Sequence, residues 1–299
     1  MERIITYHIE DGFEGNTIRQ FLKGRLYTDK AIIALKKTPE GILLNGVWAY
    51  VNQKISSGDI LTVKLLETES SENIVPENTA LDIAYEDEDI LVVNKPADMP
   101  VHPSQNHYTG TLANAAAGYF QSQDKPFIFR CINRLDRNTT GLTILCKNQL
   151  SGGILSAMAS ERLIKRTYLA ICTDDGSLPQ EGTVDAPIGR KEGSTIERCI
   201  DFENGERAVT HYRKISFRPD KQISLIELHL ETGRTHQIRV HMKHIGHPLI
   251  GDDLYGGDCT LIKRQALHSH SLEFTHPVTL EKMYFEQEIA EDMSRILFW

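Results

Sequence analysis

The chain has 299 residues, of which 40% are hydrophobic and 25% are charged, as in an ordinary globular protein with room for one large and one small domain. No apolar run approaches the ~20 residues that span a bilayer, and residues 1–6 lack the apolar core of a signal peptide. The five cysteines are scattered, odd in number and without CxxC spacing. We therefore expect a cytoplasmic protein with reduced thiols, and not a membrane-spanning or disulfide-stabilised one.

The net charge of −8 is unevenly distributed along the chain. Residues 67–89 hold nine Asp and Glu and no Lys or Arg, whereas residues 13–65 hold eight Lys and Arg against four Asp and Glu. Residues 232–251 carry three Lys and Arg, four histidines and no acid. Because the local field matters more than net charge to a polyanionic partner, both basic segments are candidate nucleic-acid contacts. For residues 13–65 an ordinary solvated surface is an equally good interpretation.

Residues 1–66 are predicted to form a small module of two helices and a strand pair. Asn16 and Thr28 are placed to cap the two helices, because each precedes apolar residues at helical spacing. The pair Asn45-Gly46 after an apolar run is a strong signal for a hairpin turn. A last strand is expected over residues 60–65.

Residues 67–80 are polar and acidic and are predicted to link this module to a larger domain over residues 81–299. Apolar or alternating stretches in the larger domain predict strands at 90–93, 142–146, 167–172 and 223–230. The expected strands outnumber the helices and do not alternate regularly with them. This pattern favours an α+β fold with a mixed or antiparallel sheet over a doubly wound parallel one.

The densest group of chemically informative residues is the stretch NRLDRNTTGL at 133–142. In it, Asp136 stands between Arg134 and Arg137, just before an apolar run. Flanking cations keep a carboxylate ionised and in place. An ionised, positioned Asp is what a nucleophile or a charge stabiliser requires.

A second informative stretch is a helix predicted over residues 235–245, with Thr235 as its cap and Gly246 as its end. Arg239 then lies near the start of the helix, where anions bind favourably. We infer that Arg239 pairs with Asp136, since an adjacent Arg lowers the pKa of an Asp and fixes its orientation. A purely structural ion pair is the alternative.

Two other side chains are weaker candidates. Tyr168 opens a strand after a Lys-Arg pair, and we interpret it as a half-buried strand tyrosine or as a ring that stacks on a base. Lys95 ends a buried strand, and the loop that begins at Pro96 is of the kind that often borders sites, although a simple turn is the default interpretation.

The histidines at 236, 241, 244 and 247 raise the question of a metal site. The last three would share a helical face only if the helix continued past Gly246. There is no HExxH pattern and no carboxylate among them. We therefore expect no metal site, and histidines that form hydrogen bonds or contact phosphate instead.

Taken together, these stretches resemble the motifs of the RluA/RluD family of RNA pseudouridine synthases. The resemblance covers about residues 83–285. The motifs are LVVNKP at 91–96, VHP at 101–103, RLD at 134–136, TGL at 140–142, RTYLA at 166–170, TGRTHQIRVH at 232–241, GHP at 246–248, GD at 251–252, RQALH at 264–268 and HP at 276–277.

The resemblance implies an isomerase that converts uridine to pseudouridine in RNA. Asp136 would be its catalytic aspartate, paired with Arg239, and Arg134 would hold the place of the flipped-out nucleotide. Tyr168 would pack against the target base, with proton transfer as a possible second role. The further RNA contacts implied are Lys95, Arg166, Arg234, Thr235, His236 and Gln237.

The implied fold is the pseudouridine synthase fold, an α+β fold with a long, mixed, largely antiparallel sheet and RNA in a basic cleft. Residues 1–66 resemble an S4-type RNA-binding module. No cofactor or metal is implied, because the reaction neither oxidises nor hydrolyses its substrate. We expect a monomer that acts on ribosomal rather than transfer RNA without an obligate protein partner. The alternatives are a tRNA pseudouridine synthase or a non-catalytic RNA-binding protein on the same scaffold.

One position departs from the pattern of the family, which usually has His immediately before Arg-Leu-Asp. Asn133 stands there instead, and Asn forms hydrogen bonds but cannot become cationic. The departure puts local RNA contacts in doubt and leaves Asp136 untouched.

Overall fold

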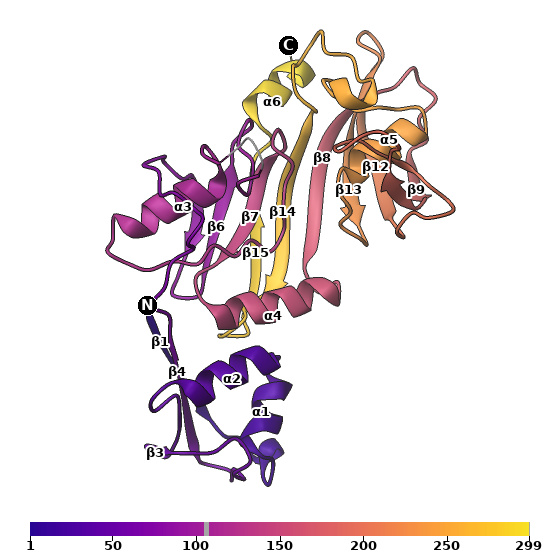
Figure 1. Cartoon of the computed structure of the whole chain (residues 1–299). Helices are drawn as coiled ribbons and strands as arrows, with labels where there is room; N and C mark the ends of the chain where they lie inside the picture. The colour runs from indigo at the N-terminus through magenta and orange to yellow at the C-terminus, as the bar shows by residue number, and fades with distance from the viewer. Residues whose placement is uncertain (105–107, 299) are drawn as a thin grey trace.

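The computed structural model describes residues 1–104 and 108–298. Its first 66 residues form a four-stranded antiparallel sheet in the order β1-β4-β2-β3, with two helices packed on it (Figure 1). The predicted hairpin turn between β2 and β3 is confirmed, since Asn45 and Gly46 have φ angles of 52° and 78°. The elements are β1 Glu2–His8, α1 Ile18–Gly24, α2 Asp29–Lys37, β2 Ile42–Leu44, β3 Val47–Trp48 and β4 Ile60–Leu66.

The two helices begin at threonines that cap them. Thr28 caps α2 as predicted. The prediction of Asn16 as the cap of α1 is wrong by one residue, because Thr17 caps this helix in a reciprocal capping box with Gln20. The Gln20 side chain accepts a hydrogen bond of 2.8 Å from the backbone N–H of Thr17, and Asn16 has no such partner three residues further on. Strand β1 was not predicted, and it forms because it pairs along its whole length with β4.

The larger part of the chain is built around a nine-stranded sheet in the order β5-β6-β7-β14-β8-β13-β12-β9, with β15 paired to β14. Neighbouring strands are antiparallel except β7 and β14, so the predicted α+β fold with a mixed, largely antiparallel sheet is confirmed. The strands are β5 Ile83–Glu86, β6 Ile90–Lys95, β7 Thr140–Cys146, β8 Lys165–Thr173, β9 Glu181–Asp185, β12 Val209–Arg218, β13 Ile223–Leu230, β14 Leu267–Thr275 and β15 Lys282–Glu286.

Helices lie at both ends of this sheet (Figure 1). Helix α3 is near β6, and α5 is near β12 at the opposite end. Helix α4 faces α2 of the N-terminal module (Figure 1). No helix in the described residues is both long and apolar enough to cross a membrane. The remaining elements are α3 Leu112–Gln121, α4 Gln149–Ser160, α5 Gln237–His244, α6 Glu291–Phe298, the two-stranded ribbon of β10 Ile188–Arg190 and β11 Arg198–Ile200, and the short 3-10 helices η1 Asp11–Phe13 and η2 Asp253–Tyr255.

The acidic segment at residues 67–80 contains no helix or strand, but it is fastened to the larger domain. The carboxylate of Glu67 accepts hydrogen bonds from Arg130 at 3.0 Å and from the backbone N–H of Gln149. Glu77 accepts from the backbone N–H of Gly110 at 2.9 Å. The segment therefore runs along the surface of the larger domain, held by partners that are distant in sequence.

The centre of the sheet brings three distant residues into one row. Gly141 of β7 is opposite Ser269 of β14, and Ser269 is opposite Tyr168 of β8. Since β7 and β14 are parallel, the loop that ends at Thr139 and the start of β14 lie at the same edge of the sheet. This register places the RLD stretch and Tyr168 next to each other.

Gly141 is required for this close approach. Its φ is +106°, and a Cβ at this position would lie 2.2 Å from the carbonyl oxygen of Ser269. We expect Gly141→Ala to lower the free energy of unfolding by more than about 3 kcal/mol, measured by urea denaturation. Gly176→Ala is the matched control, because Gly176 has a φ of +101° but its Cβ would meet nothing closer than 3.9 Å. Equal losses in the two variants would show that the steric contact is unimportant.

Candidate active site

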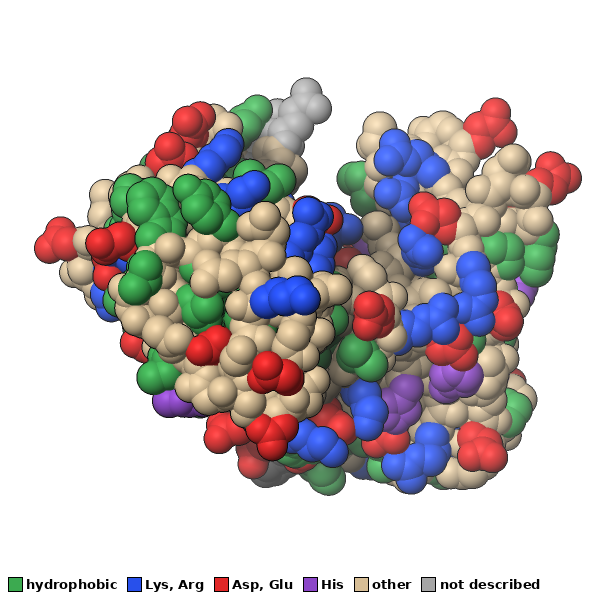
Figure 2. Space-filling view, turned by 90° about the horizontal axis from the view of Figure 1, so that it is seen from below, with side chains coloured by type: hydrophobic (Ala, Val, Ile, Leu, Met, Phe, Trp, Pro, Cys, Tyr) green, Lys and Arg blue, Asp and Glu red, His purple; other side chains and the backbone are tan. Residues whose placement is uncertain are grey.

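A cavity of about 510 Å³ opens where the RLD loop, the start of β8 and the segment before α5 meet. Figure 2 shows the molecule hollowed between two lobes, with Lys and Arg side chains on both walls. Asp136 is the one carboxylate that lines the cavity among the described residues. It is surrounded by five arginines: Arg134, Arg137, Arg166, Arg234 and Arg239. Such a cavity favours an anionic ligand and concentrates positive charge around one acid.

The predicted pair between Arg239 and Asp136 is present. Arg239 Nη1 donates to Asp136 Oδ2 at 3.1 Å, and the Asp136 side chain is 26% exposed toward the cavity. His236 Nε2 lies 3.9 Å from the same oxygen. Burial lowers the pKa of His236, so this ring is neutral near pH 7 and Arg239 supplies the opposing charge.

Arg239 has a second acidic partner that was not predicted. Asp252, whose side chain is fully buried, accepts from Arg239 Nε at 2.7 Å and from Nη2 at 2.8 Å. Burial alone would lower the pKa of Arg239, but the two carboxylates outweigh it and raise the pKa above its ordinary value. The Tyr255 ring covers the guanidinium at 4.9 Å from its centre. In the sequence, Asp252 appeared only as part of the GD motif, and its turn-forming neighbours gave no sign that it reaches back to α5.

The start of α5 differs from the prediction. The helix begins at Gln237, and neither Thr235 nor His236 provides a side-chain cap. His236 takes a left-handed conformation with φ of 57°, and its Nδ1 is 2.8 Å from the hydroxyl of Tyr255. This turn directs His236 into the cavity wall and leaves Thr235 exposed at the rim, so the predicted cap is wrong because a tertiary contact fixes the residue that follows it.

Tyr168 lines the cavity and is 5% exposed, so it is more deeply buried than the predicted half-buried strand tyrosine. Burial, more than any neighbouring charge, raises the pKa of its hydroxyl. The hydroxyl therefore keeps its proton at neutral pH and is able to donate a hydrogen bond.

The side chains of Lys95 and Gln237, both predicted to contact RNA, are buried, and their polar groups are engaged within the protein. Lys95 Nζ donates to the carbonyls of Pro96, Met99 and Arg137 at 2.7, 2.9 and 3.0 Å. Since Arg137 follows Asp136 directly, Lys95 holds the loop that carries the catalytic candidate. The amide of Gln237 makes four hydrogen bonds, to the backbone of residues 209 and 234 and to two threonine hydroxyls.

The burial of Lys95 predicts a specific pH dependence of stability. Burial lowers the pKa of Lys95 to about 7 in the folded protein, whereas an unfolded chain keeps a lysine protonated up to about pH 10.4. Between these values the unfolded chain binds more protons, so the free energy of unfolding rises with pH. From pH 7 to pH 9, wild type should gain about 2–3 kcal/mol more than Lys95→Met in urea denaturation. Equal gains in both proteins would contradict this.

The remaining predicted contacts lie on the cavity wall. Arg134, Arg234 and Thr235 are exposed, and Arg166 is partly exposed. Asn133, where the family usually has His, is buried and donates to the carbonyl of Leu142 at 2.9 Å, while its Oδ1 accepts from the Ile144 backbone at 2.9 Å. Asn133 therefore ties the RLD loop to β7.

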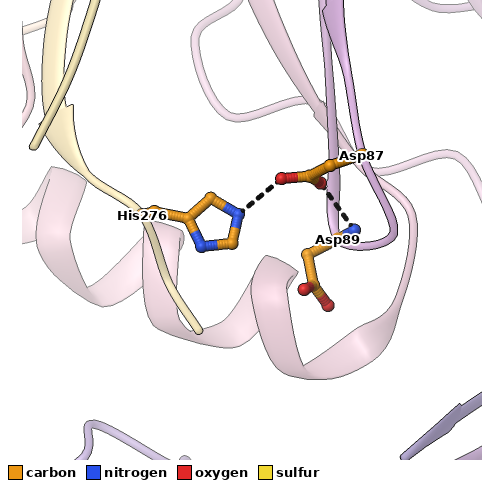
Figure 3. A group of neighbouring side chains, drawn as sticks. All are labelled: Asp87, Asp89 and His276. Carbon is orange, nitrogen blue, oxygen red and sulfur yellow. Dashed lines mark hydrogen bonds and ion pairs between the residues drawn. The ribbon is translucent and has the colours of Figure 1, made fainter. Parts of the chain in front are cut away.

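The histidines around α5 have separate partners. His236 bonds a tyrosine hydroxyl, His241 a threonine hydroxyl and His247 a backbone carbonyl. Within residues 1–104 and 108–298, one group has ligand atoms close enough for a metal: Asp87, Asp89 and His276 (Figure 3).

The geometry of this group does not fit a metal ion. His276 Nδ1 accepts hydrogen bonds from two backbone N–H groups, so the ring proton lies on Nε2, which faces Asp87 Oδ2 at 2.9 Å (Figure 3). Asp89 is bound by both Arg3 and Asn148. The group is a hydrogen-bonded network that attaches β1 of the N-terminal module to the larger domain.

Comparison with known proteins identifies the class of the site. Residues 89–244 match the family described as RNA pseudouridylate synthase. The chain is 41% identical over 283 residues to the uncharacterized RNA pseudouridine synthase YjbO of Bacillus subtilis, covering 94% of this chain and 98% of that protein. It is 40% identical over 259 residues to ribosomal large subunit pseudouridine synthase D of Zymomonas mobilis, covering 82% and 80%.

A solved structure is also similar. Human RNA Pseudouridylate Synthase Domain Containing 1 superimposes with a TM-score of 0.58 at 26% identity, covering 71% of this chain and 84% of that one. The chain belongs to the RNA pseudouridine synthases of the RluA/RluD family, as its motifs predicted, and is therefore an isomerase that acts on RNA.

Proposed function

We propose that this protein converts uridine to pseudouridine in ribosomal RNA of the large subunit, with Asp136 as the catalytic residue. The observation that carries the proposal is the position of Asp136, the lining carboxylate of a cavity walled by five arginines. A flipped nucleotide brings negative phosphates to these arginines and its sugar to the carboxylate. Extruding a base from its stack costs a few kcal/mol, about what one or two stacking or phosphate contacts return.

The reaction breaks the N1–C1′ bond, turns the uracil and joins C5 to C1′. Asp136 either attacks C1′, with the electrons of the broken bond going to the base, or takes the C2′ proton to give a glycal. In the first route the carboxylate leaves again when C5 bonds to C1′. In the second route the protonated Asp136 returns its proton to C2′ as C5 bonds to C1′. In both routes the proton on C5 is then lost and N1 gains a proton. One carboxylate suffices, because the base is the leaving group and no water attacks. Tyr168, which is buried and protonated, would pack against the base and serve the proton transfer.

The preference for ribosomal RNA is supported by the relatives. Proteins named ribosomal large subunit pseudouridine synthase D from Zymomonas mobilis and Neisseria meningitidis are 40% and 36% identical to this chain. The basic N-terminal module, with its S4-like order of helices and strands, supports binding to a large structured RNA. Trp48 and Tyr50 on this module are 61% and 80% exposed and are able to stack on bases.

The test is transcriptome-wide pseudouridine mapping in cells that lack this gene, complemented with wild type or Asp136→Asn. We expect one or more sites in large-subunit ribosomal RNA to disappear and to return only with wild type. Loss of a transfer RNA site instead would assign the alternative substrate. If no site changes and the purified protein binds RNA without turnover, the protein is a non-catalytic RNA-binding member of the family.

A further inference from the structure

Arg239 is shared unequally between two carboxylates. Asp252 receives two hydrogen bonds from its fork, at 2.7 and 2.8 Å, whereas Asp136 receives one, at 3.1 Å from Nη1. Asp252 is fully buried, whereas Asp136 is 26% exposed. An Arg prefers to bind a carboxylate with two parallel hydrogen bonds. Asp252 is therefore the main partner of the guanidinium, and Asp136 is the weaker one.

The contacts of Asp136 also distinguish its two oxygens. Both its pair with Arg239 and its approach to His236 involve Oδ2. In the described part of the chain, Oδ1 receives no hydrogen bond and remains available to a ligand in the cavity. We propose that Asp252 is a positioning residue that occupies the fork of Arg239, so that Asp136 is oriented through Oδ2 while Oδ1 stays reactive. This inference rests on the proposed role of Asp136.

The segment that carries Asp252 is built to hold this arrangement. Gly251 has a φ of +73°, and a Cβ there would lie 2.0 Å from the carbonyl oxygen of Arg264, so the backbone is tightly confined. Three residues after Asp252, the Tyr255 ring covers the guanidinium of Arg239, and its hydroxyl bonds His236. One short turn therefore fixes both groups that contact Oδ2 of Asp136.

Removing the charge of Asp252 would affect the ionisation of Asp136 in two ways, and both act in the same direction. A nearby negative charge would be lost, and Arg239 would be free to turn its fork toward Asp136. Both effects favour the ionised form of Asp136 and make it a weaker nucleophile and base. The other titratable or charged groups around Asp136 are His236 before α5, Lys95 at the end of β6, Tyr168 on β8, Tyr255 on η2 and, on the cavity wall, Arg134, Arg137, Arg166 and Arg234. The charge of Asp252 raises the pKa of His236, so its loss would lower this pKa further and His236 would stay neutral.

The experiment compares wild type with Asp252→Asn in single-turnover assays on the RNA identified by mapping, from pH 4.5 to 8.5. We expect the rate constant at saturating RNA to fall about 10- to 100-fold, with the Kd for RNA within about twofold of wild type. We expect the acid limb of the pH–rate profile to move to lower pH. A wild-type rate and an unmoved acid limb in this variant would overturn the inference.

Asp174→Asn is the matched control, because Asp174 is also a fully buried carboxylate, paired with Lys214 at 2.8 Å, but it does not line the cavity. It should lower the thermal stability without moving the acid limb or the rate constant. If Asp174→Asn reproduces the effects of Asp252→Asn on the rate, Asp252 is merely structural and the inference is wrong.

Asp252→Glu keeps the charge but not the geometry, so it should lose rate with its acid limb in the wild-type position. If Asp252→Asn does not fold, this variant decides the matter, since an unchanged rate constant would overturn the inference. Inactive wild-type protein would instead contradict the proposed function.

Discussion

Asp136→Asn is expected to lower the single-turnover rate constant for pseudouridine formation by at least about 10⁴-fold. Asn has nearly the same shape as Asp but cannot attack C1′ or take a proton from C2′. Asp136 is 26% exposed and makes a single short contact, to Arg239, so its replacement leaves the packing of the loop in place. RNA binding should therefore survive, since the surrounding arginines supply the attraction for phosphate.

The measurement pairs the single-turnover assay with RNA binding by filter retention on the same preparations. Asp98→Asn is the control, because Asp98 is 75% exposed and paired with Arg137, close to the same loop but outside the cavity lining. We expect it to keep the wild-type rate within about twofold, as for surface substitutions generally. Turnover by Asp136→Asn above a thousandth of the wild-type rate would exclude this carboxylate as the reactive group.

Tyr168→Phe is expected to lower the same rate constant by about 10²- to 10³-fold, the range of a general acid or base. Phe keeps the ring that would pack against the target base, so the Kd for RNA should change little. The lost group is a hydroxyl that burial keeps protonated at the wall of the cavity. Tyr168→Leu, which also removes the aromatic ring, should weaken both binding and turnover.

Tyr212→Phe provides the comparison for this substitution. Tyr212 is a buried strand tyrosine, 7% exposed, on β12, and it does not line the cavity. Both variants lose one buried hydroxyl, so their thermal stabilities should be similar while only Tyr168→Phe loses rate. A full rate in Tyr168→Phe would restrict Tyr168 to packing and assign the proton transfer to another group.

Features set by neighbouring residues were predictable from the sequence. Thr28 defines the start of a helix through a hydrogen bond that its side chain accepts from the backbone three residues further on. Asn45-Gly46 defines a turn because both residues take a positive φ. The strand at 90–93 was predictable from its apolar run, because a strand that is buried on both faces has apolar residues at every position. The cap at Thr235 failed because the contact of His236 with Tyr255 comes from a distant segment.

In the active site, too, some features could be predicted from the sequence and others could not. The pair of Asp136 and Arg239 was predictable because both residues lie in dense motifs whose charges are complementary. The same reasoning assigned Lys95 and Gln237 to RNA, because a sequence shows which groups can bind phosphate but not whether folding has buried them. Asp252 was missed because nothing local indicates that its carboxylate meets a guanidinium 13 residues earlier.

The sequence by itself determined the family, the reaction class and the central acid of this protein, since these depend on residue types at fixed spacings. Only the tertiary structure decided which groups are free to act. The parallel pairing of β7 with β14 placed Gly141, Ser269 and Tyr168 in one row, and burial removed Lys95 and Gln237 from the surface. It also gave the fork of Arg239 to Asp252 rather than to Asp136. Hydrogen bonds and desolvation between distant segments depend on the folded geometry, and no local pattern encodes them.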